Sequence, residues 1–122
     1  MANRPTYQID ERETPDYSFT LRDSAGIVVP ASLIDSATLT VQVVHTGAIV
    51  NARSAQNVKN ANNVTISEEG RITWSMQPLD AAIADDTKLI EVHRALFRFV
   101  WNGTREKPYE VDFEIRNLSK MP

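Results

Sequence analysis

The histidines His45 and His93 are the side chains of this 122-residue sequence best suited to proton transfer near neutral pH. His93 lies on the apolar side of a long alternating segment, a position that favours a hydrogen-bonded core or boundary histidine. His45 comes just before Thr46-Gly47 at the end of another such segment, where an exposed turn residue is expected. Neither is accompanied by an H-x-x-x-H spacing or a G-x-S-x-G motif. The sequence therefore predicts a non-enzymatic protein with no catalytic residue, no metal site and no cofactor.

Acidic residues form short runs, among them Asp85-Asp86, that fall in predicted turns and loops. Calcium prefers several loop oxygens as ligands, but the D-x-D-x-D-G spacing is missing, so solvated acids are expected there. The sequence has no cysteine, which excludes disulfides, thiolate zinc sites and a cysteine nucleophile. Its 13 basic and 16 acidic residues give a net charge of -3, so we expect no nucleic-acid or membrane partner.

The chain is predicted to consist mainly of strands, because apolar and polar side chains alternate along most of it. The longest alternating stretch, 90–115, predicts two antiparallel strands joined around Asn102-Gly103. Turn signals at intervals of roughly ten residues separate the shorter stretches, and residues 54–63, rich in Asn, predict a surface loop. We therefore expect an all-β fold, an immunoglobulin-like antiparallel β-sandwich of about seven strands, with a short helical connector near 78–85.

The parity of the closing hairpin sets the length of its loop. A two-residue turn at Asn102-Gly103 would bring side chains of opposite faces together, so a loop with an odd number of residues is required. We expect a five-residue loop, 102–106, that pairs Phe99 with Tyr109, Arg98 with Glu110 and Arg94 with Glu114. Opposite charges that face each other across two strands stabilise a sheet by roughly 0.2–1 kcal/mol per pair.

The predicted domain spans residues 15–118, between an extended N-terminal arm, 1–14, and a C-terminal tail, 119–122. The arm has few apolar residues, so we expect it to be loose or to be ordered by a partner. Its candidate anchoring residues are Arg4, Pro5, Tyr7 and Ile9. The long strand offers a second surface, because its outer face mixes apolar and basic side chains. The candidate docking face there consists of Arg94, Leu96, Arg98 and Val100.

Four local patterns occur in the order found in a known group of proteins. They are the strand and L-x-D-x-x-G turn at Tyr17–Gly26, the lead into a strand at Leu33–Val41, the G-x-I-x-W hairpin at Glu69–Trp74, and a long closing hairpin with Asn102-Gly103 and Pro108. Over about residues 14–118, their order and spacing resemble the immunoglobulin-like domains of tailed-bacteriophage virion structural proteins. The resemblance is to the N-terminal domain of siphophage baseplate upper proteins in particular.

The resemblance implies a structural protein of a bacteriophage particle, made in the host cytoplasm and located in the virion. Such a protein would be a head decoration, neck or tail/baseplate component, with other virion proteins as partners and multiple copies in a symmetric assembly. The alternative is a carbohydrate- or cell-surface-binding β-sandwich module. That alternative requires exposed aromatic rings that stack on a sugar, with Trp74, Trp101 or Tyr7 as candidates.

Overall fold

Strands make up most of the computed structural model, which describes residues 5–120. They are β1 (Thr6–Asp10), β2 (Asp16–Thr20), β3 (Ile34–Val43), β4 (Gln56–Asn57), β5 (Val64–Ile66), β6 (Arg71–Ser75), β7 (Ile90–Trp101) and β8 (Arg105–Arg116). The 3-10 helices are η1 (Ala31–Leu33), η2 (Pro78–Ala81) and η3 (Leu118–Lys120). The predicted all-β fold is confirmed, with eight described strands in place of about seven. The helical connector is shorter than expected and ends at Ala81.

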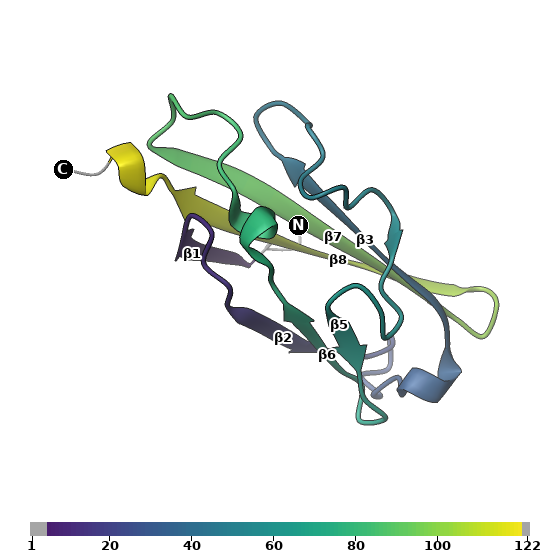
Figure 1. Ribbon diagram of the computed structural model, residues 1–122. Helices are drawn as coiled ribbons and strands as arrows, with labels where there is room; N and C mark the ends of the chain where they lie inside the picture. The colour runs from purple at the N-terminus through teal and green to yellow at the C-terminus, as the bar shows by residue number, and fades with distance from the viewer. Residues whose placement is uncertain (1–4, 121–122) are drawn as a thin grey trace.

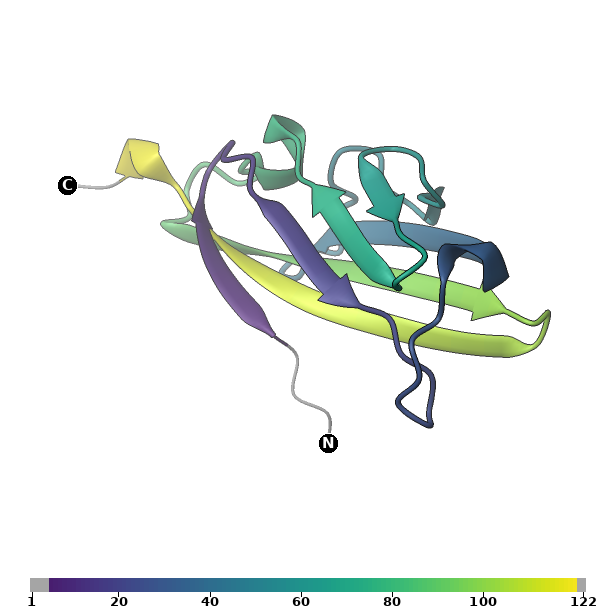
Figure 2. The same cartoon turned by 90° about the horizontal axis from the view of Figure 1, so that it is seen from below.

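The strands form two packed sheets, β1-β8-β7-β3-β4 and β2-β6-β5 (Figure 1). Figure 2 shows the layers from below, with β2 and β6 on one side of the long strands β7 and β8. In immunoglobulin-like sandwiches, strands B, E and D form one sheet and strands C, F and G the other. Here β2, β6 and β5 take the first set of places and β3, β7 and β8 the second, while β4 lies beside β3 as an added edge strand.

The first strand corrects the prediction of a separate arm over residues 1–14. Thr6–Asp10 pairs in parallel with β8, so Ile9 lies beside Ile115 and residues 6–10 belong to the sandwich. The sheets are therefore not purely antiparallel. Arg12, with a φ of 60°, turns the chain toward the other sheet, and its N–H donates to the carbonyl of Ala81 at 2.9 Å. The sequence did not reveal β1 because only Ile9 in it is buried.

The closing hairpin has a three-residue loop, 102–104, and the predicted five-residue loop is wrong. The odd parity is confirmed, but the register differs by two residues from the expected one. The observed pairs are Trp101 with Arg105, Phe99 with Lys107, Phe97 with Tyr109, Arg98 with Pro108 and Arg94 with Asp112.

Turn geometry explains the shorter loop. Asn102 and Gly103 both have positive φ angles, 53° and 68°, which asparagine and glycine tolerate better than other residues. The N–H of Gly103 also donates to Asp35 Oδ2 at 2.7 Å, so the start of the neighbouring strand β3 caps the turn. Burial alone allowed both odd lengths, and this local chemistry selects the shorter one.

The core fills the space between the two sheets. Inward positions of β7 and β6 place Phe97, Phe99 and Trp74 at 0% exposure. Phe19 of β2 stacks on Tyr109 of β8 with ring centroids 3.9 Å apart, which joins the layers near one edge. Residues 54–63, predicted as a surface loop, also contribute to the fold, because β4 pairs with β3 and Val58 is fully buried.

Candidate docking surface

The predicted docking residues share the outer face of the five-stranded sheet. Arg94, Leu96, Arg98 and Val100 alternate along β7 with fully buried core residues, so all four point away from the core. The same face continues toward the start of β7 with further aliphatic side chains. Together, four aliphatic side chains of this face form a row along the strand, termed the β7 stripe: Ile90, Val92, Leu96 and Val100. Ile90 is 40% exposed and the others are half-buried.

The two arginines of this face reach sideways to β8. Arg94 donates to both carboxylate oxygens of Asp112, at 2.9 and 3.2 Å, and this interaction is the main reason that the pKa of Arg94 is raised. Arg98 donates to Glu106 Oε1 at 3.1 Å in an exposed pair. Since both cations are neutralised on the β8 side, the β7 stripe adjoins uncharged side chains toward β3.

Different chemistry flanks the β7 stripe on its two sides. On β8 the outward side chains between the loop and Arg116 are mostly acidic, namely Glu106, Pro108, Glu110, Asp112 and Glu114. On β3 they are polar and uncharged, namely Ser36, Thr38, Thr40 and Gln42. The docking surface, which we define as these two rows and the β7 face between them, is thus striped along the strand direction.

The candidate anchoring residues do not form a free anchor. The carbonyl of Pro5 accepts from the N–H of Asp112 at 2.9 Å, and Ile9 is buried against the core. Tyr7 is 46% exposed, but its ring packs edge-on against Tyr17 with centroids 5.2 Å apart. These contacts hold β1 within its own domain. Arg4 lies outside the described residues.

A buried ion pair that the sequence analysis missed joins the loop before β4 to η2. Arg53 Nε donates to Asp80 Oδ1 and Nη2 donates to Oδ2 at 3.1 Å, and the two side chains are 2% and 0% exposed. Arg53 also donates to Asn63 Oδ1 at 2.9 Å and lies over the ring of Trp74, 5.7 Å from its centroid. These donors are directed at partners inside the protein, so the pair is structural. The sequence gives one sign of this pair, because Arg53 is the single charged residue in the stretch 46–58.

His93 is a hydrogen-bonded core histidine, as predicted. Its Nδ1 lies 3.0 Å from the carbonyl oxygen of Asp80 and its Nε2 lies 2.6 Å from Glu91 Oε1. A carbonyl oxygen only accepts, so Nδ1 carries a hydrogen, and a second hydrogen must lie between Nε2 and the carboxyl group. Glu91 also accepts the N–H groups of Ala84 and Asp85, both at 2.9 Å. The cluster therefore holds the loop after η2 onto β7, and His93, at 1% exposure, has no face for a substrate.

The remaining acids and His45 lie at the surface. His45 is an exposed turn residue, as predicted. Asp85 accepts hydrogen bonds from the hydroxyl and N–H of Thr87, and Asp86 accepts from Asn117 and Ser119; these bonds lower the pKa of both carboxyl groups. Within residues 5–120, no group of three histidine or acidic side chains is placed to hold a metal ion.

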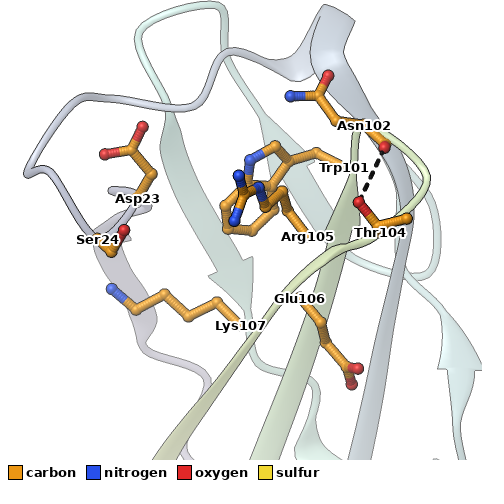
Figure 3. Close-up of a pocket in the computed structure, with 8 residues that line it drawn as sticks. All are labelled: Asp23, Ser24, Trp101, Asn102, Thr104, Arg105, Glu106 and Lys107. Carbon is orange, nitrogen blue, oxygen red and sulfur yellow. Dashed lines mark hydrogen bonds between the residues drawn. The ribbon is translucent and has the colours of Figure 1, made fainter.

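An open depression of about 840 Å³ lies beside the closing turn (Figure 3). Asp23 and Ser24 line one side of it, and Arg105 and Lys107 line another, with Trp101 behind Arg105 in this view. Trp101 is 7% exposed and Trp74 is completely buried. Because stacking on a sugar requires an exposed ring face, the two tryptophans do not form the platform that a carbohydrate-binding module would need.

Comparison with known proteins adds no relative: no family model, no curated protein and no solved structure matches this chain. Among the described residues, no helix is long and apolar enough to cross a membrane.

Proposed function

We propose that this protein is a non-enzymatic structural component of a bacteriophage particle that docks in multiple copies on a symmetric assembly. The docking surface carries the proposal, because it places the β7 stripe on an open sheet face between an acidic row and a neutral row. The order of the sequence motifs, which resembles that of phage virion domains, supports the assignment to a particle. Head, neck and tail/baseplate positions are all compatible with such a surface.

The chemistry of this face suits contact with protein. Protein interfaces have apolar centres and polar rims, and arginine is enriched in them. Leu96 lies in the middle of the stripe, and Arg94 beside it is already held by Asp112, so its charge needs no new partner on docking. Repeated copies on a symmetric particle would add avidity to an individually modest contact.

A sugar-binding function is not favoured by the structure. The two tryptophans that could have stacked on a sugar are buried, and Tyr7 packs against the core at one edge. The depression in Figure 3 combines two carboxylate side chains with two basic ones, without an exposed ring face.

The proposal is tested on particles of the encoding phage. The gene is deleted and supplied in trans as wild type, as Leu96→Asp, or as Ile27→Asp, a matched change at a 64% exposed aliphatic residue off the docking surface. Quantitative mass spectrometry of purified particles then counts the copies. We expect wild type and Ile27→Asp to be equally abundant and Leu96→Asp to fall at least about tenfold. Absence of the wild-type protein from purified particles would contradict the proposal.

A further inference from the structure

We propose that the free edge of β2 binds an extended segment of another protein as an added antiparallel strand, in which an acidic residue is followed by alternating apolar residues. This edge belongs to the smaller sheet, whereas the docking surface lies on the larger one, so the inference does not depend on the proposed function. It rests on unpaired backbone groups, on an exposed aromatic ring beside them and on two cations at one end of the edge.

Strand β2 has one paired and one unpaired side. Its odd-numbered residues bond to β6, and just beyond the strand the N–H of Leu21 continues this pattern by donating to the carbonyl of Gly70 at 2.8 Å. In an antiparallel strand the residues in between direct their backbone groups to the opposite side. Those residues have no backbone partner within residues 5–120, and they are Asp16, Ser18 and Thr20.

The chain itself closes more of the other edges. On β5, the N–H of Ile66 donates to Asn60 Oδ1 at 2.7 Å. On β1, the N–H of Asp10 donates to Glu13 Oε1 at 2.9 Å, and the carbonyl of Asp10 accepts from Glu13 at 3.1 Å. The residues of β1 that stay open are Thr6 and Gln8. Proteins usually cover or interrupt an edge strand because open backbone groups pair with other chains, so the longer open row on β2 is a site for an added strand.

The added strand would also cover a part of β1 that no strand faces. In immunoglobulin-like sandwiches strand A lies beside strand B. Here β1 pairs with β8 in the larger sheet, and no described strand lies beyond β2 (Figure 2). Tyr7 of β1 packs against Tyr17 of β2, yet its ring is still 46% exposed. An apolar side chain opposite Tyr17 would lie against this ring and remove it from water.

Two cations lie where the open row of β2 ends. Arg105 and Lys107 of β8 have the same inward parity as Tyr109, and they line the depression beyond the end of β2 (Figure 3). Lys107 Nζ donates to the carbonyl of Arg22 at 2.9 Å, so this side chain reaches the line of the β2 edge. Arg105 has no hydrogen bond or ion pair within residues 5–120. Both cations are therefore within reach of a segment that continues past the edge.

The carboxylates of the depression do not neutralise these cations. Asp23 Oδ1 accepts from two backbone N–H groups of its own turn, both at 2.9 Å. Glu106 is paired with Arg98 on the outer face of the sheet. Two cations thus share the depression with the single carboxylate of Asp23, and they attract an acidic side chain. At the other end of the edge Asp16 is exposed and disfavours one.

This arrangement specifies the sequence pattern of the segment. Because β2 runs toward the depression, an antiparallel partner begins there and ends beside Tyr7. Its acidic residue therefore comes first. Every second side chain of the segment then points inward, the last of them opposite Tyr17, because directly opposed residues share one face of a sheet. The predicted pattern is acidic-x-apolar-x-apolar, where the x residues pair with Thr20 and Ser18 and face solvent.

A designed peptide with this pattern, Ser-Glu-Thr-Val-Thr-Val-Thr with blocked ends, is the probe. It is titrated into the ¹⁵N-labelled protein and followed by NMR. We expect a dissociation constant between about 10 µM and 1 mM, with the amide signals of Ser18 and Thr20 shifted and their hydrogen exchange slowed. The same residues in reverse order should bind at least about fivefold more weakly, because the acidic residue then lies near Asp16. Equal affinity of the two orders would overturn the proposed direction.

Two N-methylated peptides isolate the backbone pairing without any change in the protein. A methyl group on the second threonine removes the N–H that is directed at Ser18, so binding should fall at least about tenfold. A methyl group on the valine that follows it blocks an N–H directed away from β2, and affinity should stay within about threefold of the parent peptide. Equal losses would overturn the added strand.

Variants of the protein locate the site. Arg105→Glu should weaken binding of the parent peptide about threefold and strengthen binding of a peptide with lysine in place of its glutamate. Leu96→Asp, on the docking surface, should leave both affinities unchanged. Sensitivity to Leu96→Asp in place of Arg105→Glu, or no binding up to about 2 mM peptide, would overturn the inference. Without peptide, a dimer that protects the amides of Ser18 and Thr20 would assign the edge to a second copy and overturn the proposed partner.

Discussion

Buried charges set the chemistry of this protein at the scale of single residues. Arg53 with Asp80 and His93 with Glu91 lie under the loops that flank η2, and each pair satisfies backbone or side-chain groups around it. A buried charge is costly unless it is paired and hydrogen-bonded, so these residues act as structural ties. Burial in these ties also explains why His93 is unavailable to a substrate.

We expect Asp80→Ala to destabilise the protein by about 3–5 kcal/mol, because it leaves the Arg53 guanidinium buried without its carboxylate. Urea unfolding monitored by tryptophan fluorescence measures the change in the free energy of unfolding. The control is Glu106→Ala, which removes the exposed partner of Arg98 and should cost about 1 kcal/mol or less. Equal losses in the two variants would contradict a structural role for the buried pair.

Glu91 predicts a dependence of stability on pH. Burial opposes ionisation of its carboxyl group, but the N–H of Ala84, His93 and the N–H of Asp85 together lower its pKa below the ordinary 4.5. A carboxyl whose pKa is lower in the folded state adds stability that is complete above its unfolded pKa and is lost as the pH falls through its folded pKa. The stability that Glu91 contributes should therefore decline in acid.

The variant Glu91→Gln isolates this contribution. At pH 7 it should be less stable by about 1–3 kcal/mol, because the amide cannot accept from both backbone N–H groups. The difference should shrink as urea unfolding is repeated from pH 7 down to pH 3. Exposed acids such as Asp85 titrate in both proteins and cancel in the comparison. Curves that stay parallel over this range would rule the prediction out.

At the scale of elements, the alternation of apolar and polar residues predicts the strands, but turn residues and edge-strand contacts set the hairpin register and the place of β1. Alternation along 90–115 predicts both strands and the outward positions of the docking residues. The length of the hairpin loop depends on Asn102, on Gly103 and on the hydrogen bond that Gly103 donates to Asp35, a residue distant in the sequence. Likewise, β1 has a single buried apolar residue, so its place in the sheet follows from contact with β8 and not from its own pattern.

The glycines of two turns should respond differently to a methyl group. Gly70 and Gly103 both have positive φ, 74° and 68°, so alanine strains either turn, by about 1–2 kcal/mol. At Gly70 an added Cβ would also lie 3.0 Å from the carbonyl oxygen of Val29, whereas at Gly103 nothing lies within 4 Å. We expect Gly70→Ala to cost a further 1–3 kcal/mol or so in thermal and urea unfolding. Equal losses would show that backbone strain alone matters.

Deletion of residues 1–10 should destabilise the sandwich and promote aggregation. The deletion removes the buried side chain of Ile9, worth about 1.5–3 kcal/mol, and uncovers the backbone edge of β8. Melting temperature and light scattering measure the two effects. Ile9→Ala, which keeps the strand, should lower stability without exposing the edge. A truncated protein as stable and monodisperse as the full chain would show that residues 6–10 are a dispensable arm.

The whole molecule is organised by contacts between distant parts of the chain. β1 pairs with β8, and β3 pairs with β7, so both ends of the sequence must meet before the larger sheet is complete. Closing such loops costs entropy before the contacts stabilise the chain, which slows folding. The absence of cysteine leaves packing and hydrogen bonds to hold the closed sandwich.

This topology predicts slow refolding. Stopped-flow refolding followed by the fluorescence of Trp74 and Trp101, both buried, should show a main phase with a time constant between about a millisecond and several seconds. The refolding time constants of the variants Ile9→Ala in β1 and Phe97→Leu in the core can be compared in the same experiment. Full recovery of the native signal in less than about a millisecond would contradict the prediction.

Local alternation determined the fold class, the strands of the closing hairpin, the burial of His93 and the outward face of β7, because side-chain direction in a strand depends only on neighbouring residues. The hairpin register, the place of β1 and the Arg53–Asp80 pair required the folded chain. Each depends on a partner far away in the sequence, and many partners satisfy the same local pattern. The β7 residues of the proposed docking surface could be predicted from the sequence, whereas the acidic and neutral rows beside them follow from the pairing of β8, β7 and β3.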